Sequence, residues 1–344
     1  MSKMQQPGAG VVTAATAWGS PGFEIPTYTV TDAARVVLEQ IADALGDVFD
    51  RSEPATQLTI ARFAALHINI ASPELAAAIY KAMREVPIQR VRGVPVTGGA
   101  ALIATTLSLL RGGEVFQYHE QLGGVLTAPI EPKVGSAANS NSSPDPFGIH
   151  TDDAVMPAPF RVEEIALLGV HNPPGTLTGF ALLDAVLDRG ELTLASREHL
   201  MDPRYGIKSP NAFSLADDHW LDCVAILSHD GQGRMEIAFP SYNTRPTWSN
   251  DHEAERALAN LTAALEAAMI DIYIEPGDWL VWNNSLLAHR RGAIGEGRRL
   301  LWRNYLRRDC DAMREATGTP GPIFSANALL NSGTAVAEET RYAG

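Results

Sequence analysis

The sequence predicts a mainly β protein with flanking helices, whose core is a double-stranded β-helix (jelly roll) or a related β-sandwich. From residue 87 onward, short apolar runs are separated by Gly, Pro, Asn and Asp, which is typical of strands joined by turns. Helical periodicity is confined to the first quarter of the chain and to one later segment. Strands and helices do not alternate regularly, so a parallel α/β sheet is disfavoured.

Three helices are expected between about residues 30 and 86. The first spans Thr31–Gly46, where a threonine cap precedes apolar residues at helical spacing. The second covers Gln57–Leu66. The third runs over Ser72–Met83, because a serine cap, a proline and an acidic residue follow one another at its start. The N-terminal quarter is therefore predicted to be mainly helical.

The segment of about residues 87–310 is predicted to form the jelly-roll core. One strong helix interrupts it at Asp251–Met269, with an aspartate cap and leucines on one face. No glycine pair in this segment has the spacing of a nucleotide-binding loop. The expected strands are short, as in sandwiches, and lie at Arg90–Pro95, Val125–Ile130, Ile165–Val170, Gly179–Leu183, Cys223–Ser228, Glu236–Phe239 and Leu280–Asn283.

Composition restricts the partners and metals of this 344-residue chain. Its net charge of −13 disfavours nucleic acid and anionic membranes as partners. Its two cysteines, Cys223 and Cys310, are too few for a disulfide framework, a thiolate zinc site or an iron–sulfur cluster. A bound metal must therefore use His, Asp or Glu.

Residues 1–22 are expected to be a flexible tail, and residues 23–344 a single domain. The tail is rich in Gly, Ala, Thr, Ser and Pro without periodicity. No apolar run has the length of a membrane span, and no continuous apolar region near the start has the character of a secretory signal. We therefore expect a cytoplasmic protein.

Two histidines stand in informative surroundings. His150 and Asp152 are one residue apart on a segment expected to be extended, so their side chains project from the same face and can reach one metal ion. His289 follows a Pro-Gly-Asp turn, an apolar strand and a polar turn. Two imidazoles and one carboxylate on one face of a metal suit non-haem Fe(II). His-x-Asp alone is a common chance pattern.

Basic and apolar residues alternate after His289. Arg303 and Arg307 are four positions apart and should share a face of one strand, together with Arg299. Two readings are open. These arginines form the solvent face of an edge strand, or they line an interior pocket for anions.

The order of these motifs resembles the Fe(II)/2-oxoglutarate-dependent dioxygenases of the TauD/TfdA superfamily, within it the clavaminate synthase-like branch that includes amino-acid hydroxylases. The resemblance covers roughly residues 85–310. It implies that His150, Asp152 and His289 hold Fe(II) at the mouth of the barrel, with 2-oxoglutarate and O₂ as cosubstrates. It also implies a small-molecule substrate that carries an α-carboxylate.

The resemblance further assigns polar residues to ligands. Arg303, fourteen positions after His289, is expected to pair with the remote carboxylate of 2-oxoglutarate, and Arg307 with the substrate carboxylate. A supporting hydroxyl falls on Thr178, with Thr176 as the alternative. Gln121 and Ser140 are candidate substrate contacts; ordinary loop hydrogen bonding is the other interpretation.

The implied reaction is hydroxylation of an unactivated C–H in a free amino acid or a small derivative, with decarboxylation of 2-oxoglutarate to succinate and CO₂. Asp152 argues against halogenation, because halogenating relatives lack this carboxylate. Desaturation or cyclisation, a sulfonate or aryloxyacetate dioxygenase, and a non-catalytic jelly-roll binding module are alternatives. Residues 239–245 lack the paired aspartates that guanidine-hydroxylating relatives have there, which argues against a simple arginine hydroxylase. A cationic group of the substrate could still pair with a carboxylate elsewhere, at Glu120, Asp153 or Glu236.

Overall fold

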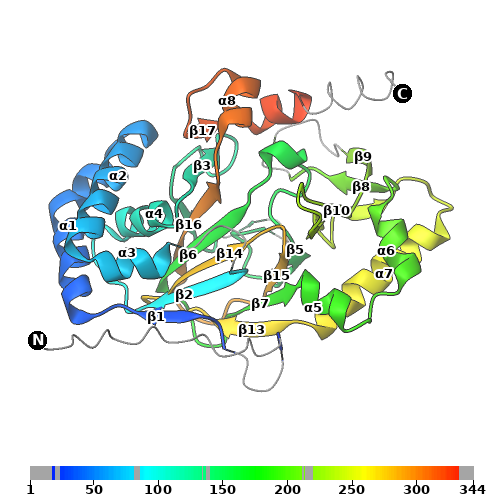
Figure 1. Ribbon diagram of the computed structural model, residues 1–344, viewed down its shortest axis with the longest axis horizontal. Helices are drawn as coiled ribbons and strands as arrows, with labels where there is room; N and C mark the ends of the chain where they lie inside the picture. The colour runs from blue at the N-terminus through cyan, green and yellow to red at the C-terminus, as the bar shows by residue number, and fades with distance from the viewer. Residues whose placement is uncertain are drawn as a thin grey trace, which may run out of the picture.

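Two sheets face each other in the computed structural model, which describes residues 18–19, 24–80, 86–133, 135–136, 140–210, 213 and 220–332 (Figure 1). The larger sheet has eight strands in the order β1 (Thr27–Thr29), β2 (Ile88–Arg92), β14 (Trp279–Asn283), β6 (Glu164–His171), β16 (Leu300–Arg307), β3 (Glu114–Tyr118) and β17 (Ile323–Phe324), with β4 (Ala128–Ile130) paired with β16. The smaller has the order β13 (Ile270–Tyr273), β7 (Leu177–Leu182), β15 (Leu287–Arg291) and β5 (Phe147–His150). The predicted mainly β fold is confirmed.

Two small sheets lie at one end of this sandwich. One contains β12 (Thr244–Pro246), β8 (Tyr205–Lys208) and β9 (Trp220–Val224), and the other pairs β10 (Leu227–His229) with β11 (Met235–Ile237). The single strand predicted at Cys223–Ser228 is therefore wrong. Cys223 adopts a left-handed φ of 61°, which is incompatible with a continuous extended strand, and the chain passes from one sheet to the other just after it.

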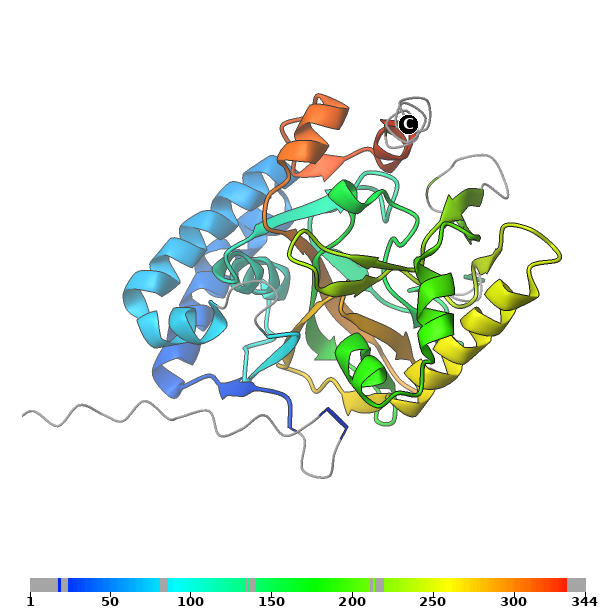
Figure 2. The same ribbon diagram turned by 45° about the vertical axis from the view of Figure 1, so that its right-hand side comes forward.

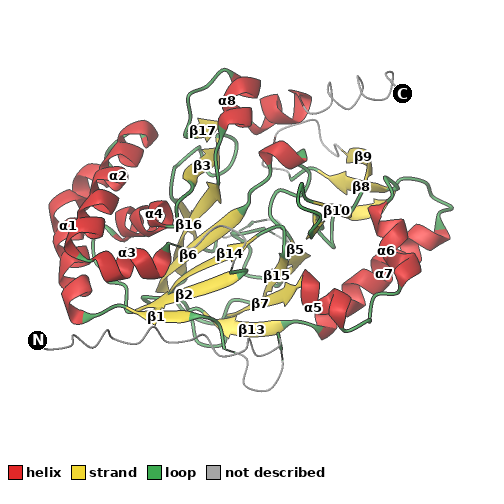
Figure 3. Cartoon of the chain, viewed as in Figure 1, coloured by secondary structure: helices red, strands yellow, loops and turns green. Residues whose placement is uncertain are grey.

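Four helices cover the outer face of the larger sheet (Figure 3). They are α1 (Asp32–Asp50), α2 (Pro54–Ala71), α3 (Pro73–Ile79) and α4 (Ala100–Leu110). The first starts at the predicted Thr31 cap but continues past Gly46 to Asp50. Gly46 lies inside the helix at a close contact with α4, where a Cβ would be 2.7 Å from the backbone of Gly99. The third ends at Ile79, and the predicted end at Met83 lies outside the described residues.

The remaining helices lie on the other side of the sandwich or near the C-terminus. They include α5 (Leu183–Asp188), α6 (Leu194–Met201), α7 (His252–Ala267), α8 (Asp311–Thr317) and the short η1 (Ala158–Phe160), and residues 326–332 are helical as well. Figure 2 shows α6 and α7 side by side. The helix predicted at 251–269 is confirmed as α7, and Asp251 caps it by accepting a hydrogen bond from the Ala254 amide at 3.0 Å. Most of the predicted tail lies outside the described residues, but Trp18 is buried and its Nε1 donates to the Ala268 carbonyl.

Strand β14 shows how the sandwich divides its core. Trp279 and Val281 pack toward α1–α4, whereas Leu280 and Trp282 pack into the space between the two sheets. This alternation follows from the two-residue period of a strand. The inter-sheet core fills the middle of the sandwich, and two cavities lie at the sandwich end beside β5 and β15. No described helix has the length and apolarity needed to cross a membrane.

Candidate metal centre

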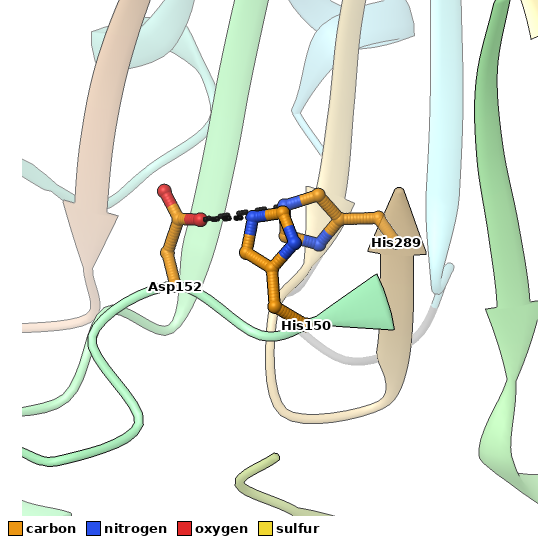
Figure 4. Close-up of side chains that lie close together, drawn as sticks. All are labelled: His150, Asp152 and His289. Carbon is orange, nitrogen blue, oxygen red and sulfur yellow. Dashed lines mark ion pairs between the residues drawn. The ribbon is translucent and has the colours of Figure 1, made fainter. Parts of the chain in front are cut away.

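Three side chains from two neighbouring strands and the turn after one of them meet at this end of the smaller sheet (Figure 4). Strands β5 and β15 are antiparallel, and their register places His150 opposite His289. His150 is the last residue of β5, and Asp152 lies in the turn that follows. The three predicted ligand residues, 139 positions apart at the extremes, are therefore brought together by strand pairing.

The potential ligand atoms of this cluster converge. Asp152 Oδ1 lies 3.2 Å from His150 Nε2 and 3.4 Å from His289 Nε2. His150 Nδ1 lies 2.7 Å from the Gly148 carbonyl, so this carbonyl holds the ring with Nε2 turned toward Asp152. Within the described part of the chain, this is the one group of three or more His, Cys, Asp or Glu residues with metal-binding geometry.

The protonation states of the cluster also suit a cation. Burial acts to raise the pKa of Asp152, but hydrogen bonds from both histidines and the charge of Arg303 outweigh it and hold the pKa well below its usual range. Burial, together with the charge of His150, lowers the pKa of His289 to about 4. At neutral pH the carboxylate is therefore ionised and this imidazole is neutral, which are the forms that bind metals.

Strand β16 holds the other oxygen of Asp152. The Tyr305 hydroxyl donates to Oδ2 at 2.7 Å, and Arg303 Nη1 donates to it at 3.2 Å. The Asn284 side chain bonds both the amide and the carbonyl of Asp152. Sequence reasoning missed Tyr305 and Asn284. Strand alternation could have found Tyr305, because it lies two positions after Arg303 and shares its face.

The cluster stands between two cavities. The outer cavity, of about 370 Å³, is lined by Gln121, Ser140, Asp153, Lys208, Tyr242 and Asn243 among others. The inner cavity, of about 50 Å³, is lined by Thr178, Trp282, His289, Arg291 and Arg299 among others. His150, Asp152 and Arg303 line both. Two molecules in these cavities would therefore meet at the cluster.

Arg303, Gln121 and Asp153 form one connected polar chain. Arg303 is 3% exposed, and its Nη2 donates to Gln121 Oε1 at 2.9 Å. Gln121 Nε2 in turn donates to Asp153 Oδ1 at 2.8 Å. Burial, followed by the charge of Asp152, raises the pKa of Asp153 to about 7. The predicted contacts Gln121 and Ser140 both line the outer cavity.

The two candidate threonines differ in their surroundings. Thr178, on β7, is buried and lines the inner cavity. Thr176 Oγ1 accepts a hydrogen bond from the Gly295 amide at 2.9 Å and holds a loop. The geometry therefore separates a cavity-lining threonine from a structural one.

Arg307 is not brought to the cluster. It is buried on β16, but its guanidinium pairs with Glu163 at 3.2 Å and donates to the carbonyls of Arg161 and Asp309. Among the described residues, neither of the two cavities counts Arg307 in its lining. Arg307 therefore lies outside the linings of both cavities and is paired with Glu163 and neighbouring backbone, and its expected substrate role stays a prediction.

Arg299 occupies the inner cavity instead. It is 4% exposed, and its Nε and Nη1 have no hydrogen-bond partner within the described part of the chain. Burial, with a further contribution from the charge of Arg291, lowers its pKa to about 9. A buried guanidinium without an acceptor is costly, so this residue marks a place prepared for an anion. The sequence left Arg299 open between a solvent-facing edge strand and an anion pocket, and the resemblance assigned it no particular ligand.

Comparisons with known proteins agree with the motif-based resemblance. Residues 214–305 match the family model described as "Taurine catabolism dioxygenase TauD, TfdA family". An asparagine oxygenase solved with Fe(II), 3-hydroxyasparagine and succinate superposes with a TM-score of 0.75 at 18% identity, covering 87% of this chain and 99% of that one. The non-heme iron oxygenase OrfP solved with Fe and α-ketoglutaric acid gives a TM-score of 0.70 at 20% identity, covering 86% and 98%. The predicted jelly-roll fold is thereby confirmed.

Proposed function

We propose that this chain is an Fe(II)- and 2-oxoglutarate-dependent oxygenase that hydroxylates an unactivated C–H of a free amino acid or a small amino-acid derivative. The observation that carries the proposal is the convergence of His150 Nε2, His289 Nε2 and Asp152 Oδ1 at the junction of two cavities. Two nitrogens and one oxygen on one side of a metal fit Fe(II) and leave positions for a chelating keto acid and O₂. Bound iron would supply O₂ activation coupled to decarboxylation of 2-oxoglutarate to succinate and CO₂.

The protein's own part begins with the orientation of Asp152. Its Oδ2 is held by Tyr305 and Arg303, so Oδ1 is left to face the two imidazoles. Supporting hydrogen bonds of this kind fix the direction of a metal-binding carboxylate. A retained carboxylate also keeps this ligand position from an incoming halide, which favours hydroxylation.

The inner cavity fits the remote carboxylate of 2-oxoglutarate. Arg299 and Thr178 line it beside His289, and the unpartnered Nε and Nη1 of Arg299 are donors left for an anion. We assign this carboxylate to Arg299 rather than to Arg303, because Arg299 has two nitrogens without a hydrogen-bond partner among the described residues, whereas Arg303 has only its Nε. Thr178 keeps its expected role as the supporting hydroxyl.

The outer cavity fits the substrate. Arg303 and Lys208 are cations in its lining, and Gln121, Ser140 and Asn243 are neutral polar groups there. The structurally similar proteins were solved with hydroxylated asparagine and hydroxylated arginine. We propose that Arg303, in place of Arg307, meets the substrate α-carboxylate. The net charge of −13 is consistent with a small-molecule substrate rather than a nucleic acid.

A succinate-release assay tests the proposal. The purified chain is incubated with Fe(II), ascorbate, 2-oxoglutarate and each of the twenty standard L-amino acids in turn. Succinate is quantified, and the masses of the products are measured by mass spectrometry. Succinate together with a gain of one oxygen atom supports hydroxylation, whereas a loss of two hydrogens indicates the desaturase alternative. Absence of Fe(II)-dependent 2-oxoglutarate binding contradicts the proposed function and favours a binding module.

A further inference from the structure

We infer that Asp153 is the residue that recognises the α-ammonium group of the substrate, so that the outer cavity selects α-amino acids over otherwise identical acids without the amine. This inference rests on the proposed function and specifies its substrate class. It starts from three carboxylates able to meet a cation, Glu120, Asp153 and Glu236. The structure separates them.

Two of these carboxylates are engaged in holding the fold. Glu120 accepts hydrogen bonds from the Ser325 hydroxyl and the Ala326 amide, at the start of the helical residues 326–332. Glu236 Oε1 accepts from the Ser285 hydroxyl at 3.1 Å. Neither lines the outer cavity, whereas Asp153 does. Asp153 is thus the carboxylate positioned to touch a substrate.

Asp153 has a buried oxygen that no described residue satisfies. The residue is 8% exposed, its Oδ1 accepts from Gln121, and its Oδ2 accepts no hydrogen bond within the described part of the chain. The nearby Tyr305 hydroxyl carries one proton and donates it to Asp152. A buried carboxylate oxygen without a donor is costly, and a donor entering the outer cavity removes that cost.

The neighbours of Asp153 indicate which donor fits. Gln121 bridges Arg303 and Asp153, with 2.9 Å to the guanidinium and 2.8 Å to the carboxylate. One amide group therefore separates a guanidinium from a carboxyl group on the same cavity wall. An α-amino acid carries its carboxylate and its ammonium group on one carbon, so it matches a cation and an anion that lie this close together. A substrate with two carboxylates, or with none, would leave one side of this pair unmatched.

The backbone at Asp153 fixes the position of its carboxylate. Asp153 adopts a left-handed φ of 52°, and its carbonyl accepts from the Met156 amide at 2.9 Å, closing a turn. Asp and Asn tolerate this conformation better than most residues. Asp153→Asn therefore keeps the shape and the backbone while removing the charge.

Calorimetric titration without O₂ tests the inference on the full chain loaded with Fe(II) and 2-oxoglutarate. The probes are the twenty standard L-amino acids, and, for the tightest binder, its 2-hydroxy analogue and its analogue lacking any side-chain amine. We expect the wild-type protein to bind the amino acid at least about 30-fold more tightly than the 2-hydroxy analogue, the lower end of the effect of removing one partner of a buried charge pair. This comparison needs no variant.

The variant isolates the residue. Asp153→Asn should weaken the binding of the amino acid about 30-fold or more, and it should change the affinity for the 2-hydroxy analogue by less than about 3-fold. Exposed Asp188, at the end of α5, provides the matched control, and Asp188→Asn should change neither. The inference would be overturned if Asp153→Asn weakened the binding of both ligands equally, or if it weakened only ligands that carry a side-chain amine. It would also be overturned if the wild-type protein bound no amino acid. Loss of 2-oxoglutarate binding in the unmodified protein would instead overturn the proposed function.

Discussion

Replacing Arg299 by methionine should have opposite effects on 2-oxoglutarate binding and on stability. The side chain is 4% exposed and its Nε and Nη1 lack partners among the described residues, so its charge is uncompensated until an anion arrives. Removing one partner of a buried charge pair costs about 2–5 kcal/mol, which corresponds to a roughly 30- to 4,000-fold weaker affinity for 2-oxoglutarate. Methionine has a similar length and removes the cation without leaving a polar group behind.

The same substitution should stabilise the ligand-free protein. Burial, with the charge of Arg291, lowers the pKa of Arg299 to about 9. Below that pH the folded protein carries the full penalty of a disfavoured charge, and each pKa unit is worth roughly 1.4 kcal/mol. Arg299→Met should therefore raise the Tm of the unliganded protein by about a few °C. If Arg299 serves ligand binding, the substitution weakens 2-oxoglutarate binding and raises the Tm. If Arg299 is structural, the substitution lowers the Tm and leaves 2-oxoglutarate binding unchanged.

Anaerobic titration of 2-oxoglutarate into the Fe(II)-loaded protein measures the first effect, and thermal unfolding without ligands measures the second. Arg303→Met is the comparison, because Arg303 lines both cavities and was expected from sequence to bind the same carboxylate. If Arg303→Met abolishes 2-oxoglutarate binding while Arg299→Met leaves it within about 3-fold of the wild type, the reasoning from the unpartnered guanidinium is refuted and the original assignment stands.

Four further outcomes are expected. Asp152→Ala should abolish turnover and metal binding, seen as loss of iron in elemental analysis; normal iron content would place the metal elsewhere. Tyr305→Phe, which removes the 2.7 Å bond to Asp152, should weaken Fe(II) about 10- to 100-fold, measured by competition with a chelator. Arg307→Leu should lower the urea midpoint while leaving substrate affinity intact, because its partners are Glu163 and backbone carbonyls; selective loss of substrate affinity would restore its sequence-based role. Arg111→Met should cost about 3–5 kcal/mol in urea unfolding, because it leaves the buried Glu164 carboxylate unpaired.

Helix α4 shows what periodicity cannot detect. Ten of its eleven residues are buried, since it lies between α1 and α2 on one side and β6 and β16 on the other. A helix buried on all sides has no amphipathic pattern. Its polar residues Thr105, Thr106 and Ser108 donate to carbonyls four residues earlier, so they satisfy themselves inside the core. By contrast, α1 and α7 each bury one face, and the sequence located both.

The site divides in the same way between local and non-local information. The metal cluster was predictable, because His150 and Asp152 are neighbours in sequence and His289 followed a recognisable turn and strand. The roles of the arginines were assigned by counting residues from His289, and that count is sensitive to strand irregularities. The register of β15 against β5 shifts between His289 and Arg291, and that of β16 against β6 shifts between Leu300 and Leu301. Each bulge moves side chains along the strand relative to the site, so only the three-dimensional structure distinguishes Arg299, Arg303 and Arg307.

Arg303 connects the parts of the site that the sequence presents separately. One of its terminal nitrogens bonds the Oδ2 of Asp152, and the other bonds Gln121, which holds Asp153. A substrate that pairs with Arg303 and Asp153 would therefore contact the same guanidinium that orients Asp152. Because a guanidinium is planar, contact with a ligand and contact with Asp152 constrain each other through one rigid group. Arg303 thus connects the lining of the outer cavity to the carboxylate of the metal cluster through its two terminal nitrogens.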